Sequence, residues 1–170
     1  MERLTNDEMA VIRAGEIEVE NFDLKDGEKI LAYFTRLPLI GGFPYKIIIV
    51  EAPDGTIRSG FRQWDTEYNF SQWTGGIYNL DRLRIITEEK IVSETDIALL
   101  KEQLLKLEQT ALPESIRNEK AIVLDGSEWK LGILLANKNI EYTWRVPTDA
   151  IALFVPIIEL ILEQYSDRIR

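Results

Sequence analysis

The chain of 170 residues contains neither cysteine nor histidine. Without cysteine, no disulfide framework or thiolate metal centre can hold the fold, so its stability must come from a hydrophobic core. Without histidine, the chain has no Ser-His-Asp triad and lacks the side chain that titrates nearest to neutral pH. Together these absences favour a binding protein over an enzyme.

The composition is sufficient for such a core. Four Trp, six Tyr and six Phe accompany an apolar fraction of 45%, which can offset the entropy lost on folding. The length predicts one domain over residues 1–170, or two sub-units, 1–92 and 93–170, that share one core.

The formal net charge is −9 and the sequence pI is about 4.7. An acidic surface argues against nucleic-acid binding and would steer a basic protein partner towards the chain, although solubility alone also explains it. The first residues are charged, with no apolar leader behind them, and the longest apolar stretch, residues 151–162, is too short to span a bilayer. We therefore expect a cytoplasmic protein that does not bind membranes.

Hydrophobic patterning predicts an α+β fold in which an antiparallel sheet of hairpins packs against a central helix and a C-terminal helix. The central helix begins at Ser93 or Thr95 and runs to about residue 109. The last helix follows Pro147, with Pro156 kinking or splitting it. A first helix over residues 6–14 begins with a Thr5–Glu8 capping box and ends at Gly15. Strands are expected at 16–20, 28–37, 45–51, 56–64, 80–87, 120–124, 129–136 and 140–146.

The densest run of aromatic residues, 61–78, overlaps a segment expected to be a loop, residues 65–79, and its composition suits recognition of a partner. Trp and Tyr provide large, rigid contacts, and carboxylates steer a basic partner. The partner-binding candidates are therefore Asp65, Glu67, Trp73 and Tyr78. The alternative for most of the run is that Phe61, Trp64 and Phe70 anchor it to the sheet, which leaves Trp73 and Tyr78 as the exposed pair.

A second hypothesis is a metal-dependent hydrolase. Glu128 and Lys130 form a Glu-x-Lys pattern, and Asp125 precedes it, as in sites where carboxylates hold a divalent cation that activates water. Because Asp125 lies in the turn directly before Glu128, an ordinary turn and amphipathic strand explain the pattern as well. No metal, cofactor or catalytic residue is predicted.

The C-terminal third resembles small bacterial α+β proteins that neutralise delivered toxins, the polymorphic-toxin immunity proteins. The shared features are an Asp-Gly turn, a Trp-bearing strand, a second strand and a Pro-led apolar helix. They are carried by residues 124–126, 129–133, 142–144, Pro147, Leu153, Ile157, Leu160 and Ile161. The resemblance implies a cytoplasmic inhibitor that binds one cognate toxin.

The sequence hypothesis is therefore an immunity-like binding protein whose partner is a basic toxin domain. The alternatives are the hydrolase and a homo-oligomeric structural or adaptor protein. A homodimer would use residues 97–107 or the apolar final helix as its seam.

Overall fold

The computed structural model describes residues 5–38, 43–74, 80–119, 121, 126–136 and 138–169. Of the expected strand at 120–124, only Ala121 belongs to these residues. Asp125 and Tyr78 lie outside them, as does the side chain of Trp73. No helix in the described ranges is both long and apolar enough to cross a membrane.

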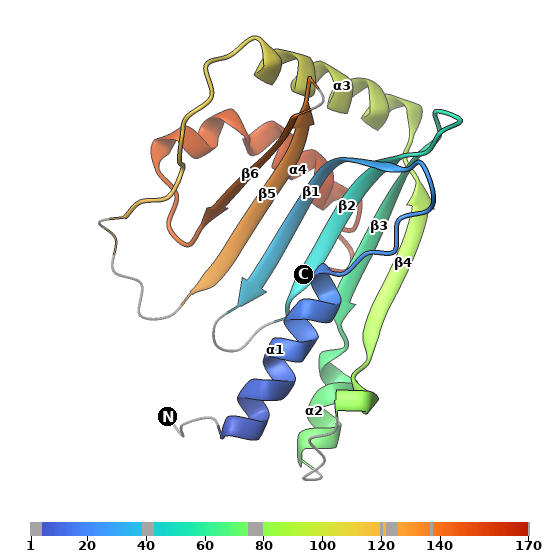
Figure 1. Ribbon diagram of the computed structural model, residues 1–170, viewed down its shortest axis with the longest axis vertical. Helices are drawn as coiled ribbons and strands as arrows, with labels where there is room; N and C mark the ends of the chain where they lie inside the picture. The colour runs from blue at the N-terminus through green and yellow to red at the C-terminus, as the bar shows by residue number, and fades with distance from the viewer. Residues whose placement is uncertain are drawn as a thin grey trace.

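The centre of the fold is a six-stranded, fully antiparallel sheet with the order β4-β3-β2-β1-β5-β6 (Figure 1). The hairpin β5–β6 joins the first four strands through β1, so both halves of the chain contribute to one sheet. The strands are β1 (Lys29–Pro38), β2 (Tyr45–Glu51), β3 (Ile57–Trp64), β4 (Ile85–Ile91), β5 (Ser127–Leu135) and β6 (Lys138–Trp144).

One face of the sheet carries the main core, under α3 (Glu94–Glu108) and α4 (Val155–Glu163). Phe61 stacks on Tyr165 with ring centroids 4.9 Å apart, and Phe154 lies 4.8 Å from Tyr142. Leu100 and Ile161 are fully buried between these layers. The expected α+β architecture is confirmed, with both predicted helices on the sheet.

The first helix is longer than expected. The predicted capping box is present, with Glu8 and Thr5 bonded reciprocally, but α1 (Asn6–Glu20) continues through Gly15. The predicted strand at 16–20 is therefore wrong. Val11, Gly15 and Val19 recur at intervals of four and form the buried stripe of a helix, which outweighs the alternation of Glu and apolar residues.

Two further boundaries differ from the prediction. Residues 65–79, expected as a loop, contain α2 (Thr66–Thr74), and a 3-10 turn at Leu80–Arg82 precedes β4, so β4 begins later than residue 80. Pro156 splits the final helical region: a 3-10 helix, Asp149–Leu153, ends before it, and Pro156 occupies the first turn of α4. This is where a missing N–H costs least.

The second face of the sheet carries α1, which crosses β2, β3 and the start of β4. A small core of Val11, Val19 and Trp64 holds the helix there, with Leu83 and Ile85 beside it. This thinner layer leaves part of the sheet face beside α1 uncovered by a helix (Figure 1).

Candidate protein-binding face

Asp65 lies where β3 passes into α2. Its Oδ1 accepts a hydrogen bond from the Tyr68 amide at 3.1 Å, as an N-cap does, and its Oδ2 lies 3.1 Å from Nε of Arg84. Two of its roles are thus structural: it begins α2 and holds Arg84. The sequence signal for the capping role is an Asp at position 65 directly before the first helical residues, Thr66 and Glu67.

Asn69 attaches α2 to the strand that follows it. This buried amide donates to the Arg84 carbonyl at 2.9 Å and accepts from the Arg84 amide at 3.0 Å. The Arg84 guanidinium also lies 5.5 Å from the centre of the Tyr68 ring. The two-way amide bond keeps α2 in one position at the end of the sheet.

Glu67 is exposed in the first turn of α2, beside these structural contacts. A carboxylate at a helix N-terminus is favoured by the helix dipole and is available to a basic partner. Of the predicted anchors, Trp64 and Phe61 are buried, whereas Phe70 is 54% exposed on α2. The side chains of Trp73 and Tyr78 lie outside the part of the chain that the structure describes, so their predicted partner contacts stay predictions.

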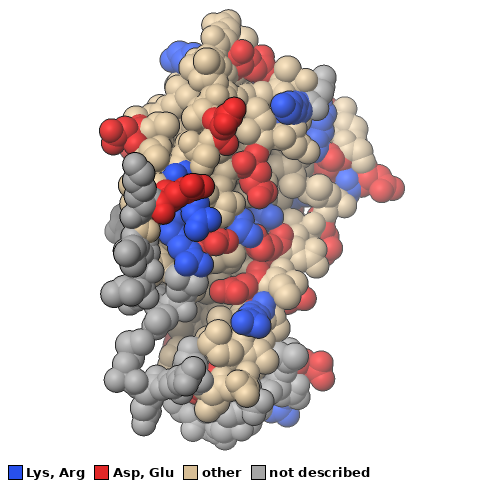
Figure 2. Space-filling model, turned by 60° about the vertical axis from the view of Figure 1, so that its left-hand side comes forward, with Lys and Arg blue, Asp and Glu red and all other residues tan. Residues whose placement is uncertain are grey.

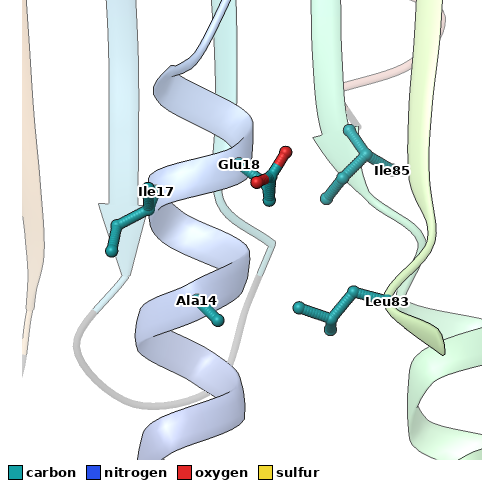
Figure 3. A pocket seen from close by; sticks show the side chains of 5 residues that line it. All are labelled: Ala14, Ile17, Glu18, Leu83 and Ile85. Carbon is teal, nitrogen blue, oxygen red and sulfur yellow. The ribbon is translucent and has the colours of Figure 1, made fainter. Parts of the chain in front are cut away.

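An apolar cleft separates α1 from the chain that enters β4. It has a volume of about 290 Å³ and is lined by Ala14, Ile17, Glu18, Leu83 and Ile85. Figure 3 shows Ala14 and Glu18 on the helix opposite Leu83 and Ile85. The volume is at the lower end of the about 300–1,000 Å³ of small-ligand pockets, and among the described residues of the lining Glu18 is the one with a polar side chain. The cleft suits an apolar side chain of a protein partner better than a polar metabolite.

The outer side of α1 also exposes two large apolar side chains. Ile17 is 65% exposed and Met9 37% exposed, on the side of the helix away from Val11 and Val19. Isolated exposed apolar residues are ordinary, but Ile17 also lines the cleft. Sequence reasoning missed this surface because it assigned residues 16–20 to a strand. The spacing of four between Met9, Arg13 and Ile17 is the signal that would have found it.

Next to α1, four neighbouring strands, β3, β2, β1 and β5, place three cations and one threonine in a row across the sheet. Thr35 lies opposite Lys46 on one side and Lys130 on the other, and Lys46 lies opposite Arg62. Residues directly opposite in an antiparallel sheet share a face. We call Lys130, Lys46 and Arg62 the cation row.

The C-terminal turn of α1 neutralises the cation row. Lys46 donates from Nζ to the Glu20 carbonyl at 2.9 Å, and Lys130 Nζ lies 2.6 Å from Glu20 Oε1. Arg62 lies 3.7 Å from a Glu18 oxygen. Burial lowers the pKa of Lys46, and burial followed by the charges of Glu20 and Glu128 raises the pKa of Glu16. Figure 2, which brings the β5–β6 side of the sheet forward, shows basic and acidic side chains interleaved across the middle of the molecule.

A second polar pair, Tyr33 and Glu141, lies on the same face of the sheet as the cation row. Tyr33 donates its hydroxyl to Glu141, and its ring lies over Gly132, the residue opposite it on β5. A β-carbon on Gly132 would lie 2.0 Å from Tyr33 Cε1, so glycine is required for this close approach. Burial, followed by the hydrogen bond to Glu141, raises the pKa of Tyr33.

The two described residues of the hydrolase hypothesis, Glu128 and Lys130, are each paired with another side chain. Lys130 pairs with Glu20, and Glu128 lies 4.0 Å from Nε of Arg145. Within the described ranges, no three Asp or Glu residues gather as a metal site requires.

The comparisons with known proteins identify no relative: no family model matches the chain, and no curated protein or solved structure does.

Proposed function

We propose that the chain is a binding protein that neutralises a basic toxin domain in the cytoplasm by docking on the surface around α1. We call this surface the docking face and define it by Ile17, Glu18, Glu67, Leu83 and Ile85. The observation that carries the proposal is an exposed apolar side chain, Ile17, at the rim of an apolar cleft flanked by a carboxylate.

The chemistry of the docking face fits a protein partner. Binding energy at protein interfaces concentrates in a few apolar or aromatic anchors that enter pockets, and peripheral charges set the association rate. The cleft can accept one such anchor from the partner, and Glu18 and Glu67 lie on the elements beside it. The charge of −9 adds long-range attraction for a basic protein.

The backbone around the docking face is well supported. Asn69 ties α2 to Arg84, and the small core under α1 fixes the opposite wall of the cleft. A rigid surface loses little entropy on binding, which is the requirement for tight inhibition.

The test begins with the immobilised chain and proteins from its own cells and their neighbours' secretions, at low and at high salt. A basic protein that mass spectrometry identifies is then purified, and its affinity and activity are measured with and without the chain. Stoichiometric binding with loss of the partner's activity supports the proposal. A captured partner whose activity is unchanged contradicts the inhibitor function.

A further inference from the structure

The outer edge of β4 has no neighbouring strand in the part of the chain that the structure describes. An open edge presents a row of backbone N–H and C=O groups to any extended chain. β4 is seven residues long and lies directly beside the cleft, because Ile85 belongs to both. The edge therefore extends the docking face with backbone hydrogen-bonding groups.

The hydrogen bonds at the two ends of β4 determine which residues face outward. The Val92 amide donates to the Ile57 carbonyl at 3.0 Å, and the Arg84 carbonyl accepts from the Asp65 amide at 3.0 Å. In an antiparallel pair, alternate residues bond the same neighbour, so even-numbered residues of β4 face β3. The outward N–H and C=O groups belong to Ile85, Thr87, Glu89 and Ile91.

The side chains of these four residues share the sheet face that carries α1. Glu89 lies opposite Gly60, and Ile85 opposite Trp64, which packs against that helix. Ile91 is 69% exposed, and the Glu89 carboxylate, 46% exposed, holds Arg58 at 2.9 Å. A strand added at the edge would run about 4.8 Å from β4, with every second side chain on this face. It would meet apolar residues at the ends of β4 and a carboxylate between them.

We infer that the β4 edge accepts an extended segment of the basic partner, in which apolar and basic side chains alternate. Strand addition takes its affinity from backbone hydrogen bonds and its selectivity from pockets for alternate side chains. One apolar side chain would pack beside Ile85, which forms a wall of the cleft, and a Lys or Arg would approach Glu89. The inference rests on the proposed function, because it names the part of the partner that docks.

A second copy of the chain fits the edge less well. Each copy carries a net charge of −9, so two copies repel one another as they approach. Charge complementarity therefore selects a basic segment.

The test uses the full chain and a synthetic peptide of alternating Val and Lys, with an alternating Val and Glu peptide of the same length as control. Amide NMR spectra are recorded during titration. The Val-Lys peptide is expected to shift the Thr87, Glu89 and Ile91 amides, and the Val-Glu peptide to leave them unchanged. Absence of these shifts with the Val-Lys peptide, or equal shifts with both, overturns the inference.

Variants at one position isolate the backbone contribution. Thr87→Pro removes an outward N–H without breaking a bond to β3, whereas Thr87→Val retains it. Peptide binding is expected to weaken at least 10-fold in Thr87→Pro and to persist in Thr87→Val, with native-like spectra for both. Equal affinity in both variants overturns the inference, as does a dimer in sedimentation whose β4 amides are already protected.

Failure of the inference is distinguishable from failure of the proposed function. If the chain inhibits a purified toxin and the toxin binds Thr87→Pro and Thr87→Val with the same affinity, the proposed function stands and the β4 edge has no part in it. If the peptide binds at β4 but no partner is inhibited, the β4 edge is a binding site and the proposed inhibitor function is wrong.

Discussion

The indole ring of Trp64 lies directly against the backbone of Gly15: a β-carbon on Gly15 would be 1.8 Å from Trp64 Cζ3. This contact lets α1 approach the sheet and explains why a helix continues through a residue that commonly ends one. The position of one wall of the cleft depends on it, because Ala14 is the neighbour of Gly15.

Replacing Gly15 with Ala should destabilise the protein, although Ala is the better helix former by about 1 kcal/mol. The added methyl group would displace the Trp64 ring, and overpacking typically costs about 1–3 kcal/mol. Urea unfolding measures the change. In a Trp64→Leu background, the same Gly15→Ala substitution should cost nothing or stabilise. An equal loss in both backgrounds would show that Trp64 is not the cause.

Substitutions of Asp65 and Glu67 should have different effects: the first should lower stability, and the second should weaken binding of a basic partner. Asp65→Ala removes the cap of α2 and should cost about 0.5–2 kcal/mol. Glu67→Ala, at an exposed position, should change stability by less than about 0.5 kcal/mol. It should slow association with a basic partner, an effect that added salt diminishes. Thermal unfolding and stopped-flow binding measure these effects. A stability loss for Glu67→Ala as large as that for Asp65→Ala would contradict the assignment.

Glu28 should make stability depend on acid pH. Arg58 donates to both Glu28 oxygens, at 2.9 and 2.6 Å, and this pair, followed by the Lys25 amide, lowers the pKa of Glu28 from 4.5 to about 2. The stabilisation is fully present above pH 4.5, where the unfolded carboxyl is also ionised, and is lost as the pH falls towards 2. In urea unfolding, Glu28→Gln should be less stable than the wild type at neutral pH, with a difference that shrinks below pH 4.5.

Glu51 provides the control for that series. It pairs with Lys29 at 3.2 Å, and the Lys29 side chain is 57% exposed. Exposed pairs contribute only about 0–1 kcal/mol, so Glu51→Gln should have a small effect at neutral pH. A loss for Glu51→Gln equal to that for Glu28→Gln, or a Glu28→Gln deficit that persists unchanged to low pH, would contradict the role of the Arg58 pair.

Glu20 should determine how the protein responds to anions. Glu20→Gln leaves the cation row with less neutralising charge and should cost about 1 kcal/mol. Sulfate should then stabilise the variant more than the wild type, because it can replace the missing carboxylate. Melting temperatures in sulfate and in chloride at equal ionic strength make the comparison. Equal sulfate responses in both proteins would show that Glu20 does not neutralise the row.

The sheet and the two helices on its main core were predictable from local patterns. The β-branched run at Tyr45–Glu51 and the alternation before Trp64 mark β2 and β3, and Ser93 caps α3 as expected. The pair Glu102–Lys106 is also present, at 2.6 Å. These signals depend on near neighbours in sequence, which a pattern reveals directly.

The docking face was less predictable because long-range contacts determine it. The fit of Gly15 to Trp64 involves residues 49 positions apart, and the cation row forms only when four strands are in register. Asp65 was expected at the partner interface, but its cap and its bond to Arg84 give it a structural role. The expectation for Glu67 remains a prediction.

The most direct test of the account is the affinity of a purified basic partner for Ile17→Asp and Leu105→Asp. Both residues carry exposed branched aliphatic side chains on helices, with Ile17 65% and Leu105 55% exposed. Leu105 lies on α3, however, on the opposite face of the sheet from α1. Calorimetry should show at least a 10-fold loss of affinity for Ile17→Asp and an unchanged affinity for Leu105→Asp, with equal melting temperatures. Unchanged binding of Ile17→Asp would contradict the docking face around α1.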